Sequence, residues 1–341
     1  MCMKLFRHVL VAFTLLMSAS VFGQDIHFTQ FQMSPLTLNP ANTGAFAGTV
    51  RLGGIFRDQW NYIGAPKGFR TPALFADAPI IRGIRKQDWV GIGVSMYQDA
   101  AGTGKLTNSS LGLSAAYHIS VNKAQTSVFT IGGQYGFFQR RLVDKNALTT
   151  EEMLVGGGTN TDFGSLSDQG VGTSDLAMGV AFRTPINKTM GLNVGFSMAH
   201  LLRPRNGLLT TSSAYRLPLR SVLHGELNMK MNPKLSLHPA FMFQSMQGAN
   251  EIALQCMAGY KLKPESTMTL RGGLGYRMRD AAKFLVGIDM GPLRIGAAYD
   301  LNLSDLSPVT NNHGGFELAA NYIITINPVP HPPAVILCPK F

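Results

Sequence analysis

From residue 49 to residue 326 the sequence repeats runs of about nine to twelve residues in which apolar and polar side chains alternate. Turn residues such as Gly, Asn, Pro and Asp separate the runs. In residues 251–262, for example, Ile252 and Leu254 fall on one face and Lys261 falls on the other. Because side chains in a strand point alternately to opposite sides, this period predicts an all-β fold of two-faced strands.

The length of the runs decides between a soluble sandwich and a membrane barrel. Strands of soluble proteins average about five or six residues, whereas about nine to eleven residues cross a bilayer at a tilt. The chain is 45% hydrophobic and only 14% charged. Lipid cannot hydrogen-bond an open sheet edge, so a spanning sheet must close. We therefore predict a transmembrane outer-membrane β-barrel of about 14 antiparallel strands over residues 49–326.

The N-terminus has the three parts of a secretory signal peptide. Lys4 and Arg7 precede an apolar run at residues 9–17, and small residues follow before Gln24. We expect residues 1–23 to be removed. No later stretch approaches the roughly 18 consecutive apolar residues of a spanning helix, so any membrane crossing must be made by strands.

Two segments are predicted to lie outside the barrel, in the periplasm. Residues 24–48 contain prolines and little alternation, and residues 327–341 form a proline-rich C-terminal tail. The tail is either disordered or a bound peptide that plugs the barrel or docks on a periplasmic partner. The candidate partner-binding residues are Pro328, Pro330, Val335, Ile336, Leu337, Cys338 and Phe341.

An even number of strands places both barrel ends on one side. Long connections are then expected at residues 140–173, 200–213 and 301–313 on the cell surface, with short turns in the periplasm. The polar faces of the strands would line the lumen. The candidate lumen charges are Arg216, Arg220, His224, Glu226, Arg271, Arg277, Asp300 and Glu317. They predict either an anion-selective or cargo-contacting lumen, or paired charges that fill the pore, and we favour the second.

Motifs for catalysis, metal binding and nucleic-acid recognition are weak or missing in the sequence. There is no G-x-S-x-G elbow, and the GTGKLT segment at residues 102–107 follows Asp99 where a phosphate loop needs glycine. His224 and Glu226 fall on one face of a predicted strand and His238 falls on the next strand, but no cysteine or supporting hydrogen-bond partner marks a metal site there. The chain has a net charge of +11, yet its basic residues are scattered. We predict no enzyme, no cofactor, no metal and no nucleic-acid partner.

Several segments of the sequence form recognisable motifs. They are QDIHFTQFQMSPLTLNPANTG at residues 24–44, AHLLRP at 199–204, PLRIGAAYDLNLSDLSPVTNNHGGFELAANY at 292–322 and the ending CPKF. These segments resemble the PorP/SprF family of the type IX secretion and gliding machinery. The resemblance covers essentially the whole mature chain.

The resemblance implies a non-enzymatic accessory or scaffold of type IX secretion in the outer membrane. Such a protein would assist export or surface display of adhesins. Its expected partners are outer-membrane lipid, periplasmic ring or peptidoglycan-linked proteins of the secretion system, and an exported adhesin. The alternative from another class is a diffusion channel or transporter for small solutes.

Overall fold

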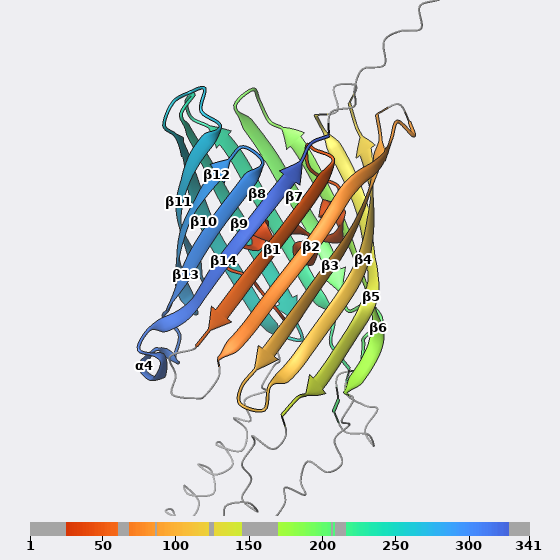
Figure 1. Cartoon of the computed structure of the whole chain (residues 1–341), viewed down its shortest axis with the longest axis vertical. Coiled ribbons are helices and arrows are strands. Elements are labelled where there is room, and N and C mark those ends of the chain that lie inside the picture. Colours follow the sequence, from red (N-terminus) through yellow and green to blue (C-terminus); the bar gives the residue numbers. More distant parts are fainter. Residues whose placement is uncertain are drawn as a thin grey trace, which may run out of the picture.

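The computed structural model describes residues 25–60, 68–85, 87–122, 126–144, 170–205, 207–208 and 216–326. In this part of the chain, 14 strands form one closed antiparallel barrel, in which each strand pairs with its neighbours in sequence and β1 closes the ring on β14 (Figure 1). The predicted fold is confirmed. The signal-peptide region and the C-terminal tail lie outside the described residues.

The strands are 10 to 15 residues long, and several exceed the predicted nine to twelve residues. They are β1 Val50–Gln59, β2 Phe69–Arg82, β3 Trp89–Ala101, β4 Leu106–Ser120, β5 Val128–Leu142, β6 Val171–Pro185, β7 Met190–Ala199, β8 Arg220–Lys230, β9 Leu235–Met246, β10 Ala249–Lys261, β11 Met268–Arg277, β12 Ala281–Met290, β13 Leu293–Asn302 and β14 His313–Ile324. A short helix, α4 Ser307–Thr310, lies between β13 and β14.

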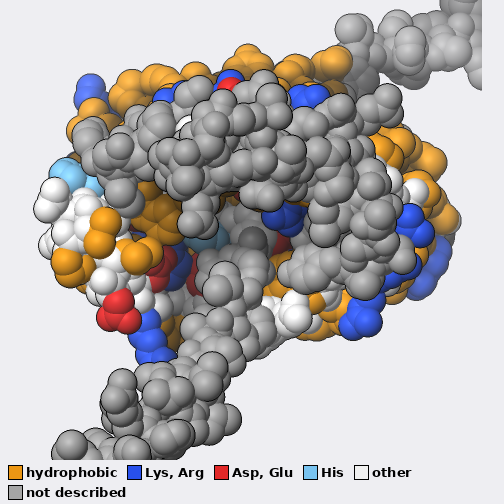
Figure 2. Space-filling model, turned by 90° about the horizontal axis from the view of Figure 1, so that it is seen from below, with side chains coloured by type: hydrophobic (Ala, Val, Ile, Leu, Met, Phe, Trp, Pro, Cys, Tyr) orange, Lys and Arg blue, Asp and Glu red, His pale blue; other side chains and the backbone are white. Residues whose placement is uncertain are grey.

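Alternation along each strand separates a lumen face from a lipid face. In β12, Leu285 is buried inside the barrel, whereas its neighbour Val286 is 61% exposed on the outer wall. Viewed from the end that carries α4, hydrophobic side chains cover much of the wall, and charged and histidine side chains are visible within the ring (Figure 2). This is the arrangement of a barrel whose solvent is lipid. Among the described residues, no helix has the length and hydropathy needed to cross a membrane.

The connections at the two ends of the barrel differ in length. Strands β1 and β14 begin and end together, because Val50 pairs with Ile324. The turns at that end are short, as at residues 186–189 and 291–292, whereas the other end carries connections 143–170 and 200–219. Outer-membrane barrels keep their short turns in the periplasm. We therefore call the end with Val50 the periplasmic end and the opposite end the outer end.

The N-terminal segment occupies the inside of the barrel, which corrects the prediction that residues 24–48 lie outside it (Figure 1). Residues 25–48, here called the plug, contain η1 Phe31–Met33, α2 Pro35–Leu38 and η2 Pro40–Asn42. The two prolines start new helical turns, because a proline at the first helical position loses no hydrogen bond. Asn39 caps η2 by accepting a hydrogen bond from the Ala41 N–H. Many backbone N–H and C=O groups of the plug are thus hydrogen-bonded within the plug itself, which allows the segment to lie inside the lumen.

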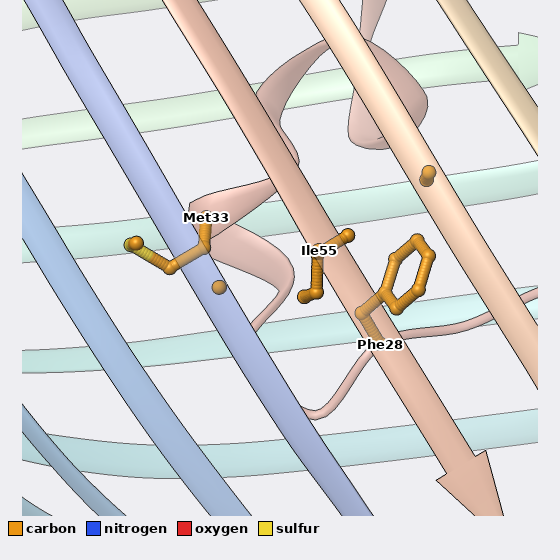
Figure 3. Packing of buried hydrophobic residues seen from close by; sticks show 5 residues of the cluster. Phe28, Met33 and Ile55 are labelled. Atoms are coloured by element: carbon orange, nitrogen blue, oxygen red, sulfur yellow. The ribbon is translucent and has the colours of Figure 1, made fainter.

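Apolar side chains of the plug pack on small inward-facing residues of the wall. Phe28 and Met33 contact Ile55 of β1, with Ala73 of β2 and Ala319 of β14 completing the cluster (Figure 3). A second cluster joins Phe31 to Val222, Ala240, Met242 and Ala253 on β8, β9 and β10. The protein therefore has its hydrophobic core at the surface of the plug, inside a barrel with an apolar outer wall.

A charge placed on the lipid face should destabilise the barrel according to its depth. We expect Val286→Arg, in the middle of β12, to lower the free energy of unfolding by roughly 2–4 kcal/mol in lipid vesicles. Val309→Arg is the matched control, since Val309 is 64% exposed in α4, beyond the strands. Denaturant titration followed by the heat-modifiable gel shift measures both. Equal losses for the two variants would contradict the assigned lipid face.

Candidate functional site

A single carboxylate on β14 holds the backbone of the plug. Glu317 Oε1 accepts the N–H of Thr29 at 2.5 Å, and its Oε2 accepts the N–H of Gln30 at 2.9 Å. Glu317 is only 1% exposed. Hydrogen bonds from two successive backbone N–H groups to an ionised acceptor are stronger than neutral ones, and here they fix the position of one peptide unit.

Arginines on two strands neutralise this carboxylate and its neighbour. Arg57 on β1 contacts Glu317 at 2.5 Å and Asp300 on β13 at 3.1 Å, and Arg277 on β11 contacts Asp300 at 2.7 Å. The Thr29 hydroxyl donates to Asp300 at 2.7 Å and accepts from Arg57 at 2.8 Å. All four charged side chains are buried. We call Thr29, Arg57, Arg277, Asp300 and Glu317 the anchor cluster.

Nearer the periplasmic end, the plug binds the opposite side of the wall. Asn39 Nδ2 donates to the Val180 carbonyl at 3.0 Å and lies 3.2 Å from His224 Nε2. His118 Nε2 lies 2.8 Å from the Thr43 carbonyl oxygen. With the anchor cluster, these contacts tie the plug to strands all around the barrel.

Where the plug leaves the lumen, a buried carboxylate accepts a hydrogen bond from its backbone. The Gly44 N–H donates to Asp77 Oδ2 at 2.7 Å, and Arg51 donates to both Asp77 oxygens. The chain then turns into β1. The plug is therefore held at both ends and along its length.

Inward-facing glycines make room for the backbone of the plug. A methyl group added at Gly132 on β5 would lie 2.5 Å from the backbone N of Ala41. One added at Gly91 on β3 would collide with the Thr43 carbonyl oxygen. Glycine in a strand interior often marks such a close backbone approach. These glycines are the sequence signal by which the plug could have been found.

The plug begins at the outer end of the lumen, beside a group of titratable side chains. Asp25 Oδ2 lies 2.8 Å from Arg220 and 3.1 Å from His200 Nε2, while His200 Nδ1 lies 2.7 Å from Asp175. Burial lowers the pKa of His200, but hydrogen bonds to Asp175 and Asp25 outweigh it and raise the pKa from 6.5 to about 9. His200 is therefore protonated at neutral pH and bridges two carboxylates.

The structure brings most of the predicted lumen residues inside the barrel. Arg220 and His224 contact the plug, Arg277, Asp300 and Glu317 belong to the anchor cluster, and Glu226 and Arg271 face the lumen nearer the periplasm. Arg216 does not line the lumen, contrary to the prediction. Pro218 cannot donate to a sheet ladder, β8 begins only at Arg220, and Arg216 lies exposed in the preceding connection.

The plug's own contact residues were missed by the sequence analysis. Thr29, Gln30 and Asn39 lie in a segment without periodicity, so no pattern assigned them a face. The tail residues proposed for partner binding, from Pro328 to Phe341, lie outside the described residues. Within the described ranges, no group of three or more His, Cys, Asp or Glu side chains is arranged to hold a metal ion.

Comparison with known families assigns the chain. A model of type IX secretion system membrane proteins of the PorP/SprF type matches residues 20–322. The chain belongs to the PorP/SprF family. It is therefore a membrane component of the type IX secretion system, and its barrel places it in the outer membrane. Membership of a secretion system also implies interaction with other proteins of that system. No curated protein matches the sequence.

Solved structures with a similar fold are outer-membrane barrels. The toluene transporter TbuX of Ralstonia pickettii has 12% identity and a TM-score of 0.50, covering 85% of this chain and 92% of that chain. A deltaS2 mutant of the monoaromatic hydrocarbon channel TodX has 9% identity and a TM-score of 0.51, covering 86% and 94%. A FadL homologue of Pseudomonas aeruginosa has 14% identity and a TM-score of 0.41, covering 89% and 95%. At these identities the likeness to TbuX and TodX shows the fold alone.

Removing the carboxylate of the anchor cluster should release the start of the plug. Glu317→Ala leaves two buried N–H groups without an acceptor and deprives Arg57 of one partner, a loss of roughly 3–5 kcal/mol. We expect much faster hydrogen exchange at the amides of Thr29 and Gln30, measured by mass spectrometry. Glu265→Ala in an exposed periplasmic turn is the control and should leave these amides protected. Unchanged protection in Glu317→Ala would contradict the assigned anchor.

The ion pairs of His200 should stabilise the folded protein at neutral pH and stop doing so at basic pH. Because the folded-state pKa is raised, the contribution is complete below pH 6.5 and is lost as pH rises through about 9. We expect the thermal midpoint of the wild type to fall over this window, and that of His200→Gln to fall less. His313→Gln, at an exposed position on β14, is the control. The same pH profile for wild type and His200→Gln would rule out the bridge.

Proposed function

We propose that this protein is a plugged, non-enzymatic scaffold of type IX secretion. It assists the export or surface display of adhesins at the outer membrane and is linked to ring or peptidoglycan-linked proteins in the periplasm. The observation that carries the proposal is the plug, which crosses the lumen from Asp25 near the outer end to Gly44 near the periplasmic end. A lumen filled by its own chain serves recognition and anchoring better than diffusion.

The energetics of the plug support a lasting closure. Displacing it would leave Glu317 and Asp300 without the donors of Thr29 and would expose Phe28, Phe31 and Met33. Uncompensated buried charges and lost apolar burial both oppose this step. A diffusion channel needs a path that opens at little cost, so the contacts of the plug argue against that alternative.

The buried polar groups of the lumen support a structural role over a catalytic one. In the anchor cluster, each carboxylate is bound by arginine and by the plug, which leaves neither as a base directed at a substrate. His118 and His224 are occupied by plug contacts. Our proposal of a non-enzymatic role rests on these arrangements.

The position of Asp25 bears on the predicted signal peptide. Asp25 lies among Arg220, His200 and Asp175 at the outer end of the lumen. Cleavage before Gln24 would leave a short polar end that fits this environment, whereas an attached apolar leader would not. We propose that leader removal precedes insertion of the plug.

Planar-bilayer conductance tests the plugged state. We expect the wild type to pass little current and Gly132→Ala to conduct measurably more, because its methyl group displaces the backbone around Ala41. Gly272→Ala is the matched control, since a methyl group there meets nothing within 4 Å. A wild type that conducts as well as Gly132→Ala would favour the diffusion channel.

Partnership is tested in the native cell envelope. We expect crosslinked pull-down of the wild type, followed by mass spectrometry, to recover periplasmic ring or peptidoglycan-linked proteins of type IX secretion, or an exported adhesin. Gly272→Ala should recover the same proteins. Recovery of the barrel alone would contradict the scaffold role.

A further inference from the structure

Between the plug and the periplasm, the lumen keeps a polar space against strands β6 to β13. Two cavities of about 140 and 120 Å³ lie there, and both are lined by Gln32 of the plug and Glu226 of β8. Charged side chains in their walls are more exposed to solvent than those of the anchor cluster. Arg294 on β13 is 46% exposed, whereas the ionised groups of the anchor cluster are at most a few per cent exposed. A ligand from the periplasm can reach this space, and the plug separates it from the outer end.

Positive charge exceeds negative charge on these walls. Arg183, Arg271 and Arg294 face two carboxylates, Glu226 and Asp289. Asp289 is shared, since it binds Arg271 at 2.7 Å and Arg294 at 2.8 Å. Arg183 has no carboxylate within 4.0 Å among the described residues and donates instead to Asn42 Oδ1 of the plug at 2.8 Å. In the described part of the chain, Arg183 is therefore held by an amide and not by a close ion pair, and Arg271 and Arg294 share one carboxylate.

The same charge continues onto the periplasmic rim. Lys230 ends β8 and Lys261 ends β10 on the lumen-facing side of their strands, and Lys234 and Lys263 lie in the adjoining turns. The backbones of Lys261 and Lys234 are hydrogen-bonded at 2.8 Å, so these turns are neighbours. Glu265 is the acidic residue within the same two turns. The lysines extend the basic surface from the cavities to the rim.

We propose that this basic inner mouth binds an acidic polypeptide segment of a periplasmic partner. The proposal rests on the proposed scaffold function and names the site of its periplasmic contact. An extended chain fits, because the cationic side chains lie both at the rim and on the lumen walls of β6, β11 and β13, where bilayer head groups cannot follow. The two cavities have room for side chains rather than for a folded domain. A carboxylate that binds Arg183 also competes with Asn42, so binding acts directly on the plug.

Binding of a fluorescent hexaglutamate peptide to the full-length barrel in nanodiscs tests the site. We expect saturable binding by anisotropy, weakened by salt, and about tenfold weaker in the double variant Arg183→Gln/Arg294→Gln. Arg205→Gln, exposed in the outer connection between β7 and β8, is the control and should bind like the wild type. Equal affinity in the double variant, or displacement of the peptide by an equal concentration of inorganic phosphate, would overturn the proposal.

A photo-crosslinking form of the same peptide locates the binding site directly on the wild-type protein. Crosslinks on the wild type at residues 226–238 and 257–271 are expected, and crosslinks confined to the outer connections would reject the site. The heat-modifiable gel shift verifies that each variant is folded. If the envelope pull-down recovers a periplasmic partner but hexaglutamate does not bind, the scaffold role stands and this site is wrong. If hexaglutamate binds and no partner is recovered, the scaffold role fails instead.

Discussion

The bidentate grip of Glu317 on the plug is the interaction on which the lumen depends. A buried carboxylate is tolerated only when it is paired and hydrogen-bonded, and Glu317 satisfies both conditions through Arg57 and the N–H groups of Thr29 and Gln30. The dependence is mutual. Without the plug, the anchor cluster would be a set of imperfectly paired charges, and without the cluster, the plug would have two orphaned N–H groups in a closed space.

The barrel could be predicted because its determinants are local. A period of two is visible within a single strand, and the outer wall needs only apolar residues at every second position, as at Phe284 and Val286 of β12. Strand number follows from counting such runs. Arg216 was placed wrongly in the lumen, because residues before Arg220 continue the alternation while Pro218 breaks the ladder. The alternation of side chains there predicts a strand, but the missing N–H of Pro218 prevents one from forming.

The plug could not be predicted in the same way because its determinants are distant in sequence. Thr29 meets Asp300 and Glu317, which follow it by more than two hundred and seventy residues. Its segment has no period, and its prolines and weak alternation predicted a periplasmic segment outside the barrel. The complementary signal lies in the wall, where Gly91 and Gly132 leave space for another backbone. A row of inward glycines in a barrel indicates an internal segment, although it does not say which one. The charged lumen residues were therefore found, but their shared partner was not.

The location of the anchor cluster connects the plug to closure of the barrel. Arg57 lies on β1, Glu317 on β14 and Asp300 on β13, so the cluster spans the seam where the first and last strands meet. The plug precedes β1 directly and runs back through the lumen to the outer end, and a closed barrel would have to admit it end-on past buried charges. Thr29 contacts Arg57 on one side of this seam and Glu317 and Asp300 on the other. The contacts that hold the plug therefore also join the first strand of the sheet to its last two.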